Sequence, residues 1–277
     1  MNFITALQAP QITEAFFRLL QENTGIDLDI SKEYLLPARL NVLAKQLGSS
    51  SLQAFLENLI ATPVGPVHWR AFEAMTTNET MFFRDQFPFE ALRENILPGI
   101  LARKQTAKEL NIWCAAASSG QEPFSLSILL KETFPELSEW HLNFLATDIS
   151  DQVLIRAQEG VYSDAEVNRG LSKEQIFKNF SPYPGGRYQI NQEMRSLIKF
   201  SKLNLIKEWP VMPKFDLVLM RNVLIYFNQD IKSAVLKKMA AQLADGGVLL
   251  LGTSESLFAS EDFLFERYQN LRFYKKG

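Results

Sequence analysis

The chain has 277 residues, 47% of them hydrophobic and 22% charged, which excludes disorder as the default and allows a substantial buried core. The formal net charge is −2, from 29 basic and 31 acidic residues, so nothing attracts the whole protein to nucleic acid. Its single cysteine, Cys114, cannot form an intramolecular disulfide. No signal-peptide pattern is evident, and no apolar run approaches the roughly 20 residues that span a bilayer. We therefore expect a cytoplasmic protein without direct membrane insertion.

The first part of the chain has the apolar periodicity of helices. Three helices are predicted, at Ile12 to Leu20 with a stop at Gly25, at Tyr34 to Leu47, and at Leu52 to Ile60. The stretch Thr62 to Pro66 then interrupts regular structure and predicts a linker. We expect residues 1–70 to form a small all-helical domain with its linker.

From residue 71 to residue 277, short apolar runs alternate with amphipathic stretches. This alternation predicts βαβ units, and hence an α/β domain with a doubly wound, mostly parallel sheet. Residues 160–199 break the rhythm and predict a small inserted β subdomain, with a hairpin tip or loop at Ser181 to Gly186. The aromatic end, from Phe265 to Tyr274, predicts a closing strand pair. The predicted strands are 110–115, 142–147, 198–202, 215–220 and 247–252, and the predicted helices are 123–134, 150–158 and 229–243.

A loop of small residues follows the first predicted strand. Ala115 to Gly120 leads into a helix that Pro123 can open at its first turn. Small side chains let a backbone approach a ligand, and free N–H groups at a helix start favour a carboxylate. Glu122 adds a negative charge that suits an ammonium or sulfonium group. An ordinary strand-to-helix turn would explain the small residues equally well.

Polar residues also follow two other predicted strands. Asp148 ends the second strand, where an acid accepts hydrogen bonds from ribose hydroxyls in doubly wound folds. Alternatively, Asp148 caps the helix that begins near Ser150. Arg221 and Asn222 follow the buried run Phe215 to Met220, and they either hold a ligand or simply end the strand. Neither G-x-G-x-x-G nor a phosphate-binding P-loop occurs, which argues against nicotinamide and triphosphate ligands.

Four segments, taken together and in order, resemble the chemotaxis receptor methyltransferase family, often called CheR. That family has a T-x-N-E-T-x-F-F-R segment ending in D or E, a W-x-A-x-x-S segment that leads into an E-P pair, a T-D-I segment, and an R-N-V-x-I-Y-F segment. The matching residues here are Thr76 to Asp85, Trp113 to Ser125, Thr147 to Ile149, and Arg221 to Phe227. The similarity extends over nearly the whole chain, although Cys114 and Ala117 replace residues that relatives often have as Ser and Cys.

The resemblance implies a class I S-adenosylmethionine methyltransferase fold and transfer of a methyl group to glutamate side chains of chemoreceptor cytoplasmic domains. It implies no metal. Family members place the equivalents of Arg84 and Tyr226 near the transferred methyl group, which makes these two the catalytic candidates. The implied cofactor-binding residues are Asn78, Thr80, Arg84, Ala115, Gly120, Glu122, Asp148, Asn204, Leu205, Arg221 and Asn222.

The implied chemistry needs no general base. A glutamate has a reference pKa of about 4.3, so its carboxylate is already the nucleophile at neutral pH. Neither His68, in the predicted linker, nor His141, at a strand entrance, is therefore expected to be catalytic. The protein is therefore expected to promote methyl transfer mainly by orienting the reactants and by excluding water.

The implied partner is the cytoplasmic helical bundle of a chemoreceptor. Arg18, Lys32, Arg39 and Lys45 could face it, or could form an ordinary solvated helix face. Relatives that bind a receptor's tether peptide use a glycine-containing loop of the inserted subdomain; the corresponding piece, Pro182 to Arg187, is short and argues against such binding. The alternatives are a methyltransferase for nucleic acid, for another protein or for a small molecule, and a cofactor-binding regulator without activity.

Overall fold

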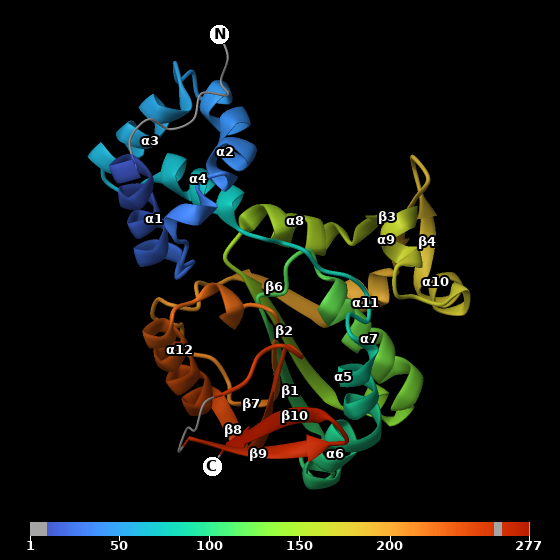
Figure 1. Cartoon of the computed structure of the whole chain (residues 1–277). Helices are drawn as coiled ribbons and strands as arrows, with labels where there is room; N and C mark the ends of the chain where they lie inside the picture. Colours follow the sequence, from blue (N-terminus) through green and yellow to red (C-terminus); the bar gives the residue numbers. More distant parts are fainter. Residues whose placement is uncertain (1–9, 258–261, 277) are drawn as a thin grey trace. The chain divides into compact units, whose positions relative to one another are not determined.

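The structure is a computed structural model that describes residues 10–257 and 262–276. Contacts within the chain divide it into two units. One unit runs to Thr77 and also includes Tyr226–Ser233, and the other comprises Asn78–Ile225 and Ala234–Gly277. The division after Thr77 lies later in the chain than residue 70, where the linker composition had suggested it. Figure 1 shows the elements of each unit.

The first unit is helical, as predicted. Its core is made of apolar side chains from four helices, including Phe16, Leu40, Leu56 and Phe72, each at most 1% exposed. Gly25 ends the first helix in a left-handed conformation with φ of 82°, which glycine adopts without steric cost. The elements are α1 (Pro10–Thr24), η1 (Ile30–Lys32), α2 (Leu35–Gln46), α3 (Leu52–Ala61) and α4 (Pro66–Met75).

The predicted linker at Thr62 to Pro66 is instead a turn inside this unit. Pro66 is the first residue of α4, a position that suits proline because its missing N–H has no partner there. Phe72 and Met75 of α4 belong to the helical core, so α4 is part of the helical unit. A domain boundary at residue 70 would fall inside this helix. His68 is likewise a buried helical residue: its Nδ1 accepts a hydrogen bond from the Gly65 N–H, and its Nε2 lies 2.8 Å from the Leu59 carbonyl.

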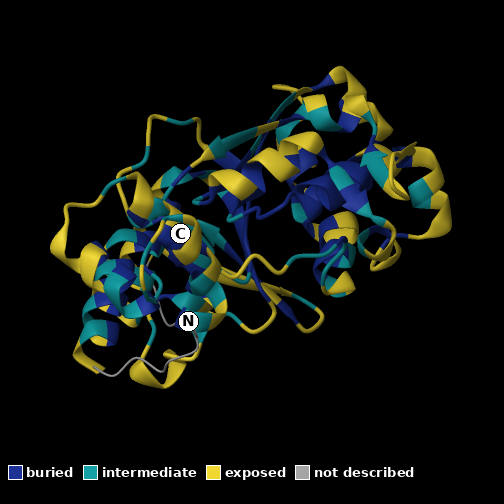
Figure 2. Ribbon diagram, turned by 90° about the horizontal axis from the view of Figure 1, so that it is seen from above, coloured by how far each residue is buried: buried dark blue, intermediate teal, exposed yellow. Residues whose placement is uncertain are grey.

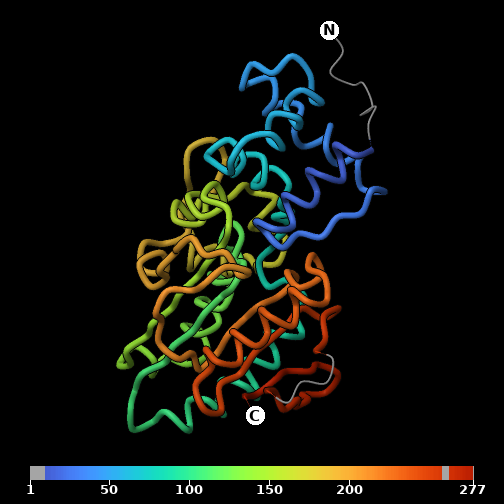
Figure 3. The backbone as a smooth tube through the Cα atoms, turned by 90° about the vertical axis from the view of Figure 1, so that its left-hand side faces the viewer, coloured from blue at the N-terminus to red at the C-terminus, as the bar shows by residue number. Residues whose placement is uncertain are grey.

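The second unit contains a seven-stranded sheet in the order β6-β2-β1-β7-β8-β10-β9. The five strands from β6 to β8 are parallel, and β10 and β9 form an antiparallel pair at the end, as predicted. This pair, red in Figure 3, lies beside the orange β8. The strands are β1 (Glu109–Ala115), β2 (His141–Asp148), β6 (Ile198–Lys202), β7 (Phe215–Met220), β8 (Leu243–Leu251), β9 (Phe263–Tyr268) and β10 (Leu271–Lys276).

Helices cover both faces of this sheet. In Figure 1, α12 lies on one side of the strands, and α5, α6 and α7 lie on the other. The central strands are largely buried, as the dark blue of Figure 2 shows; all six residues of β7 are buried, which explains why five of its residues are apolar. The helices of this unit outside the insertion are α5 (Gln86–Ala91), η2 (Leu92–Ile96), α6 (Leu97–Lys104), α7 (Gln121–Thr133), η3 (Pro135–Glu139) and α8 (Asp151–Glu159), together with the parts of η4 (Leu224–Tyr226) and α12 (Gln229–Gln242) that lie outside Tyr226–Ser233.

The predicted inserted subdomain is present as a three-stranded antiparallel sheet in the order β3-β5-β4. Ser181 to Tyr183, predicted as part of a hairpin tip or loop, belong to strand β4, and the turn itself is confined to 184–186. The subdomain consists of β3 (Val161–Ser163), α9 (Asp164–Asn168), α10 (Lys173–Asn179), β4 (Phe180–Tyr183), β5 (Arg187–Ile190) and α11 (Gln192–Leu197). Within residues 10–257 and 262–276, no helix has both the length and the apolar character needed to cross a bilayer.

Candidate functional site

The candidate site is at the carboxyl edge of the parallel strands, where doubly wound folds bind ligands. After β1 the chain continues to β2 and β6 on one side, whereas β7 lies on the other side of β1. The loops that follow β1 and β7 therefore leave in opposite directions and open a crevice between them. The segments after β6, β2, β1 and β7 carry most of the predicted cofactor-binding residues.

The loop after β1 has a backbone path that few sequences tolerate. Ala116 and Ser118 have positive φ angles of 63° and 50°, which are uncommon for residues with a side chain. Hydrogen bonds to the neighbouring β2 hold the loop: the Ala117 N–H donates to the Thr147 carbonyl at 2.8 Å, and the Ser118 N–H donates to Asp148 Oδ2 at 2.9 Å. The conformation of Ala115 to Gly120 is thus held by hydrogen bonds within the protein.

Gly120 is required by packing as well as by its φ of 93°. A Cβ atom at this position would lie 3.0 Å from Ala157 Cβ and 3.1 Å from the Tyr162 hydroxyl. Tyr162 is fully buried, and its hydroxyl donates to the Ser119 carbonyl at 2.7 Å. The sequence had suggested that a small residue here admits a ligand, whereas the structure shows protein atoms against it.

Asp148 ties two loops together through its carboxylate. Its Oδ2 accepts from the Ser118 N–H, and its Oδ1 accepts from the Ser150 N–H at 3.0 Å. The N-cap of α8 is Ser150, whose hydroxyl accepts from the Val153 N–H, so Asp148 is not the cap that the alternative interpretation supposed. An acid at the end of the second strand is where doubly wound folds hold ribose hydroxyls.

Glu122, at the start of α7, is paired with Arg221, which follows β7. Arg221 Nη1 lies 2.8 Å from Glu122 Oε2, and the two side chains are 1% and 13% exposed. Burial raises the pKa of Glu122 above its ordinary value, and the charge of Arg221 opposes that shift. Oε1 of Glu122 accepts no hydrogen bond from any described residue, so one carboxylate oxygen is left for a ligand.

Arg221 also holds the segment that contains Arg84. Its Nη2 donates to the Arg84 carbonyl at 2.8 Å and to Asp85 Oδ2 at 3.1 Å, and its guanidinium lies over the Phe89 ring. A guanidinium with planar donors suits this bridging task. Arg221, predicted to bind cofactor, is thus nearly buried by contacts within the protein, and its own role in the site is to hold Glu122 and the 84–85 segment together.

The side chain of Arg84 remains largely available. It donates one hydrogen bond, from Nη1 to the Glu79 carbonyl at 2.9 Å, and its charge is close enough to lower the pKa of Glu122. Asn78 approaches the cofactor loop through its carbonyl, which accepts from the Ser118 hydroxyl at 2.9 Å. Thr80 is half-buried on the same segment. The structure therefore brings Asn78 and Arg84 to the loops after β1 and β7, as the family motif implied.

The loop after β6 carries the remaining predicted contacts, Asn204 and Leu205. The Asn204 side chain accepts from the Ile206 N–H at 3.1 Å, which shapes a tight turn. Lys238 Nζ donates to the carbonyls of Leu205 and Lys207, both at 2.6 Å, and stacks over the Trp209 ring. The anchoring by Lys238 was not apparent from the sequence, because Lys238 lies far along the chain in α12.

Tyr226, the second catalytic candidate, groups with the helical unit, where its carbonyl accepts from the Asp27 N–H at 2.8 Å. That Tyr226 and Arg84 both lie near the transferred methyl group stays a prediction. Cys114 is fully buried in β1, and burial raises the pKa of its thiol well above the ordinary value.

Glu255, which contacts the segment after β7, was not among the residues predicted from the sequence. Its carboxylate accepts from the Asn222 N–H at 2.7 Å. The available signal was a glycine and an acid, Gly252 and Glu255, directly after the apolar strand β8. Asp85 was missed as well, although it ends the quoted family motif.

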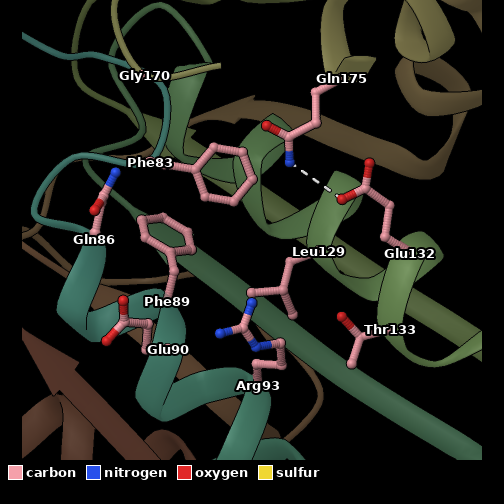
Figure 4. A pocket seen from close by; sticks show the side chains of 10 residues that line it. All are labelled: Phe83, Gln86, Phe89, Glu90, Arg93, Leu129, Glu132, Thr133, Gly170 and Gln175. Carbon is pink, nitrogen blue, oxygen red and sulfur yellow. Dashed lines mark hydrogen bonds between the residues drawn. The ribbon is translucent and has the colours of Figure 1, made fainter. Parts of the chain in front are cut away.

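A separate hollow of about 290 Å³ lies between α5, α7 and the inserted subdomain (Figure 4). Phe83 and Phe89 meet edge to face on one side, and Gln175 donates to Glu132 Oε2 at 3.1 Å on the other. None of the predicted cofactor-binding or catalytic residues lines this hollow.

Comparison with known proteins matches both parts of the chain to one family. The model described as "CheR methyltransferase, SAM binding domain" matches residues 78–272, and "CheR methyltransferase, all-alpha domain" matches residues 13–76. The chain belongs to the CheR methyltransferase family. The fold of this CheR protein is accordingly that of a class I S-adenosylmethionine methyltransferase preceded by an all-helical domain.

The curated relatives carry consistent names. "Chemotaxis protein methyltransferase Cher2" of Pseudomonas putida is 38% identical over 88% of this chain and 90% of that protein. Chemotaxis protein methyltransferases of Vibrio parahaemolyticus and Vibrio cholerae are 40% and 39% identical, each over 89% of this chain and 90% of the relative. This CheR protein is therefore an S-adenosylmethionine-dependent methyltransferase. Among its described residues, no cluster of three or more His, Cys, Asp or Glu side chains is arranged to hold a metal.

Proposed function

We propose that this protein transfers a methyl group from S-adenosylmethionine to glutamate side chains in the cytoplasmic domains of chemoreceptors, forming methyl esters in sensory adaptation. The observation that carries the proposal is the Glu122 carboxylate, which Arg221 holds by Oε2 while Oε1 accepts no hydrogen bond from the residues that the structure describes. A half-buried acid in this state suits the cationic methionine end of the cofactor. When bound, the cofactor supplies an electrophilic methyl group.

The residues present fit this cofactor. The Asp148 carboxylate can accept from ribose hydroxyls in addition to the two backbone N–H groups that it already holds. Arg84, with most of its guanidinium donors unused among described residues, is the proposed catalytic group that orients the substrate carboxylate. The proposed cofactor contacts also include Asn78, Thr80, Ala115, Gly120, Asn204, Leu205 and Asn222, whereas Arg221 is proposed to act by holding Glu122 and the 84–85 segment.

A carboxylate substrate agrees with the positions of the two histidines, neither of which lies at the site. His141 is the first residue of β2 and Asp148 the last, so His141 lies about 20 Å away, at the opposite edge of the sheet. The other histidine, His68, is buried in the helical unit. An amine or hydroxyl substrate would need a proton acceptor, whereas a glutamate at neutral pH does not.

Tyr226 is the second proposed catalytic group, acting by a hydrogen bond or by packing near the methyl group. Tyr226→Phe keeps the ring and removes the hydroxyl, so it separates these two actions. A large loss of kcat would assign the effect to the hydroxyl, and full activity would assign it to the ring or remove Tyr226 from the mechanism.

We propose a cytoplasmic location and a receptor helical bundle as the partner. Arg18 and Lys32 are exposed in the helical unit and remain candidates for docking onto acidic receptor helices. We do not expect docking of a tether peptide, given the short turn at 184–186. Calorimetric titration with a receptor C-terminal peptide tests this expectation, and tight binding would contradict it.

A tritiated-methyl transfer assay with receptor-containing membranes tests the function. We expect label in receptor protein, released as methanol by mild alkali, because carboxylate methyl esters hydrolyse readily. The Arg84→Ala variant should lose this activity, and Arg93→Ala, which changes an exposed arginine of the same unit, should keep it. Label in nucleic acid, or alkali-stable label, would contradict the proposal. Cofactor binding without any transfer would favour a regulatory protein.

A further inference from the structure

The carboxylate of Glu255 accepts hydrogen bonds from three backbone N–H groups. Its Oε2 accepts from Asn222 at 2.7 Å and from Gly252 at 2.8 Å, and its Oε1 accepts from Ile225 at 3.2 Å. Two of these donors belong to the segment after β7, and the third belongs to the segment after β8. A carboxylate is the side chain best suited to this arrangement, since both oxygens only accept.

The segment after β7 needs such support. Asn222 has a φ of 58°, a left-handed conformation that costs free energy for any residue with a side chain. Its N–H donates to Glu255, and a backbone N–H that loses its partner costs free energy when it is buried. The hydrogen bonds from Asn222 and Ile225 to Glu255 bracket the turn at both ends.

The space at Gly252 provides an independent observation. A Cβ atom there would lie 2.7 Å from Glu255 Oε2 and 2.9 Å from both the N and Nδ2 atoms of Asn222. Unlike Gly120, Gly252 does not have a left-handed φ, so its backbone would accept alanine. The glycine therefore serves the close approach of the carboxylate to Asn222.

The same loop also reaches the other side of the site. Thr253 Oγ1 lies 3.4 Å from Asp85 Oδ2, and Asp85 pairs with Arg221. The charge of Glu255 contributes to raising the pKa of Glu122. Residues Gly252 to Glu255 thus contact the segment after β7 and the Arg84–Asp85 segment.

We propose that Glu255 is a positioning residue for cofactor binding and methyl transfer, which acts by holding Asn222 and Ile225 in the turn that follows β7. The proposal rests on the assignment of Asn222 to the cofactor site and on Tyr226, the residue after Ile225, as a catalytic group. Glu255 itself needs no contact with cofactor or substrate.

The test uses two variants that disturb the same contact from opposite sides. Glu255→Gln keeps the shape and replaces one acceptor oxygen with a donor that opposes an N–H, and Gly252→Ala places a methyl group against the carboxylate. We expect each to raise the Kd for S-adenosylhomocysteine about tenfold and to lower kcat roughly 100-fold, with an unchanged KM for receptor. The double variant should be no worse than the more damaging single variant, because both remove one interaction.

Two controls match these changes. Gly99→Ala adds a methyl group where the nearest neighbour lies 4.0 Å away, at the end of the Arg103 side chain, and Glu266→Gln removes an exposed carboxylate that pairs with Lys275. Both should leave Kd and kcat unchanged. A lower melting temperature of Glu255→Gln, with Kd and kcat as in the parent at a temperature where it is folded, would overturn the proposal. Cofactor Kd is measured without receptor, so the proposal can be tested even if receptor methylation fails.

Discussion

Arg221 Nη1 lies 2.8 Å from Glu122 Oε2, and this ion pair joins the loop after β7 to the start of α7 across the crevice of the sheet. The same guanidinium binds the Arg84 carbonyl and the Asp85 carboxylate. A single nearly buried cation thereby fixes three segments that lie far apart in the sequence. Arg221 contacts Glu122 through Oε2, and Oε1 accepts no hydrogen bond from any described residue.

Removing Arg221 should be costly to stability. Arg221→Met would leave Glu122 buried without its partner, and breaking a buried pair in this way lowers the free energy of unfolding by about 3 kcal/mol. Urea denaturation measures the loss. Arg93→Met, which removes an exposed arginine paired with Glu94, should change stability by less than about 1 kcal/mol. Equal effects of the two substitutions would show that Arg221 has no special structural role.

The raised pKa of Glu122 predicts a pH dependence with a definite sign. A carboxyl whose folded pKa is above its unfolded pKa stabilises the fold at low pH, and this contribution is lost as the pH rises through the folded pKa. The free energy of unfolding of the parent minus that of Glu122→Gln should therefore fall as the pH rises from about 4 through the folded pKa. A difference in the free energy of unfolding that does not change with pH would contradict the raised pKa of Glu122.

The affinity for the cofactor should depend on pH in the opposite direction. A cationic ammonium favours the ionised form of Glu122, so affinity for S-adenosylhomocysteine should rise with pH over the same window. Calorimetry of the parent and of Glu122→Gln at several pH values measures this. The variant should bind more weakly near neutral pH and lack the rise; an identical pH profile would remove Glu122 from the cofactor site.

Arg84→Ala should reduce kcat by about 100-fold or more, because the guanidinium orients the substrate carboxylate. Affinity for the cofactor should also weaken, since Arg84 is proposed to contact it. Arg84→Lys keeps the charge without the planar donors and should restore only part of the activity. The assay is methyl transfer to receptor membranes, with cofactor Kd measured separately. Full activity and full affinity in Arg84→Ala would refute the assignment.

Arg39 should act through stability and not through receptor docking. Its guanidinium donates to the carbonyls of Met75 and Thr76 at the end of α4, and to Thr77 Oγ1. Arg39→Ala should lower the free energy of unfolding by about 2 kcal/mol, because these carbonyls lose a charged donor. Arg18→Ala, at an exposed position of α1, should have little effect on stability. An unchanged stability of Arg39→Ala with a raised KM for receptor would support docking instead.

Much of the architecture follows from local patterns. The alternation of buried strands and amphipathic helices from residue 109 onward identifies a parallel sheet, because hydrophobic periodicity depends on neighbours in the sequence. The errors also have local causes. Thr62 to Pro66 has the composition of a linker, yet such residues equally make a tight turn between two helices of one unit. Ser181 to Tyr183 contains proline and lies next to glycines, yet it forms an edge strand, where proline is tolerated.

The sequence by itself determined the order of elements, the carboxyl edge that carries the site, and the family to which the four motifs belong. Tertiary structure alone decided which of those polar residues hold one another. Arg221 and Asp148 are both engaged by the protein, whereas one oxygen of Glu122 is not. Glu255 reaches Asn222 across 33 residues, and Arg221 reaches Glu122 across 99. Such partners are chosen by the packing of distant strands, which no local pattern encodes.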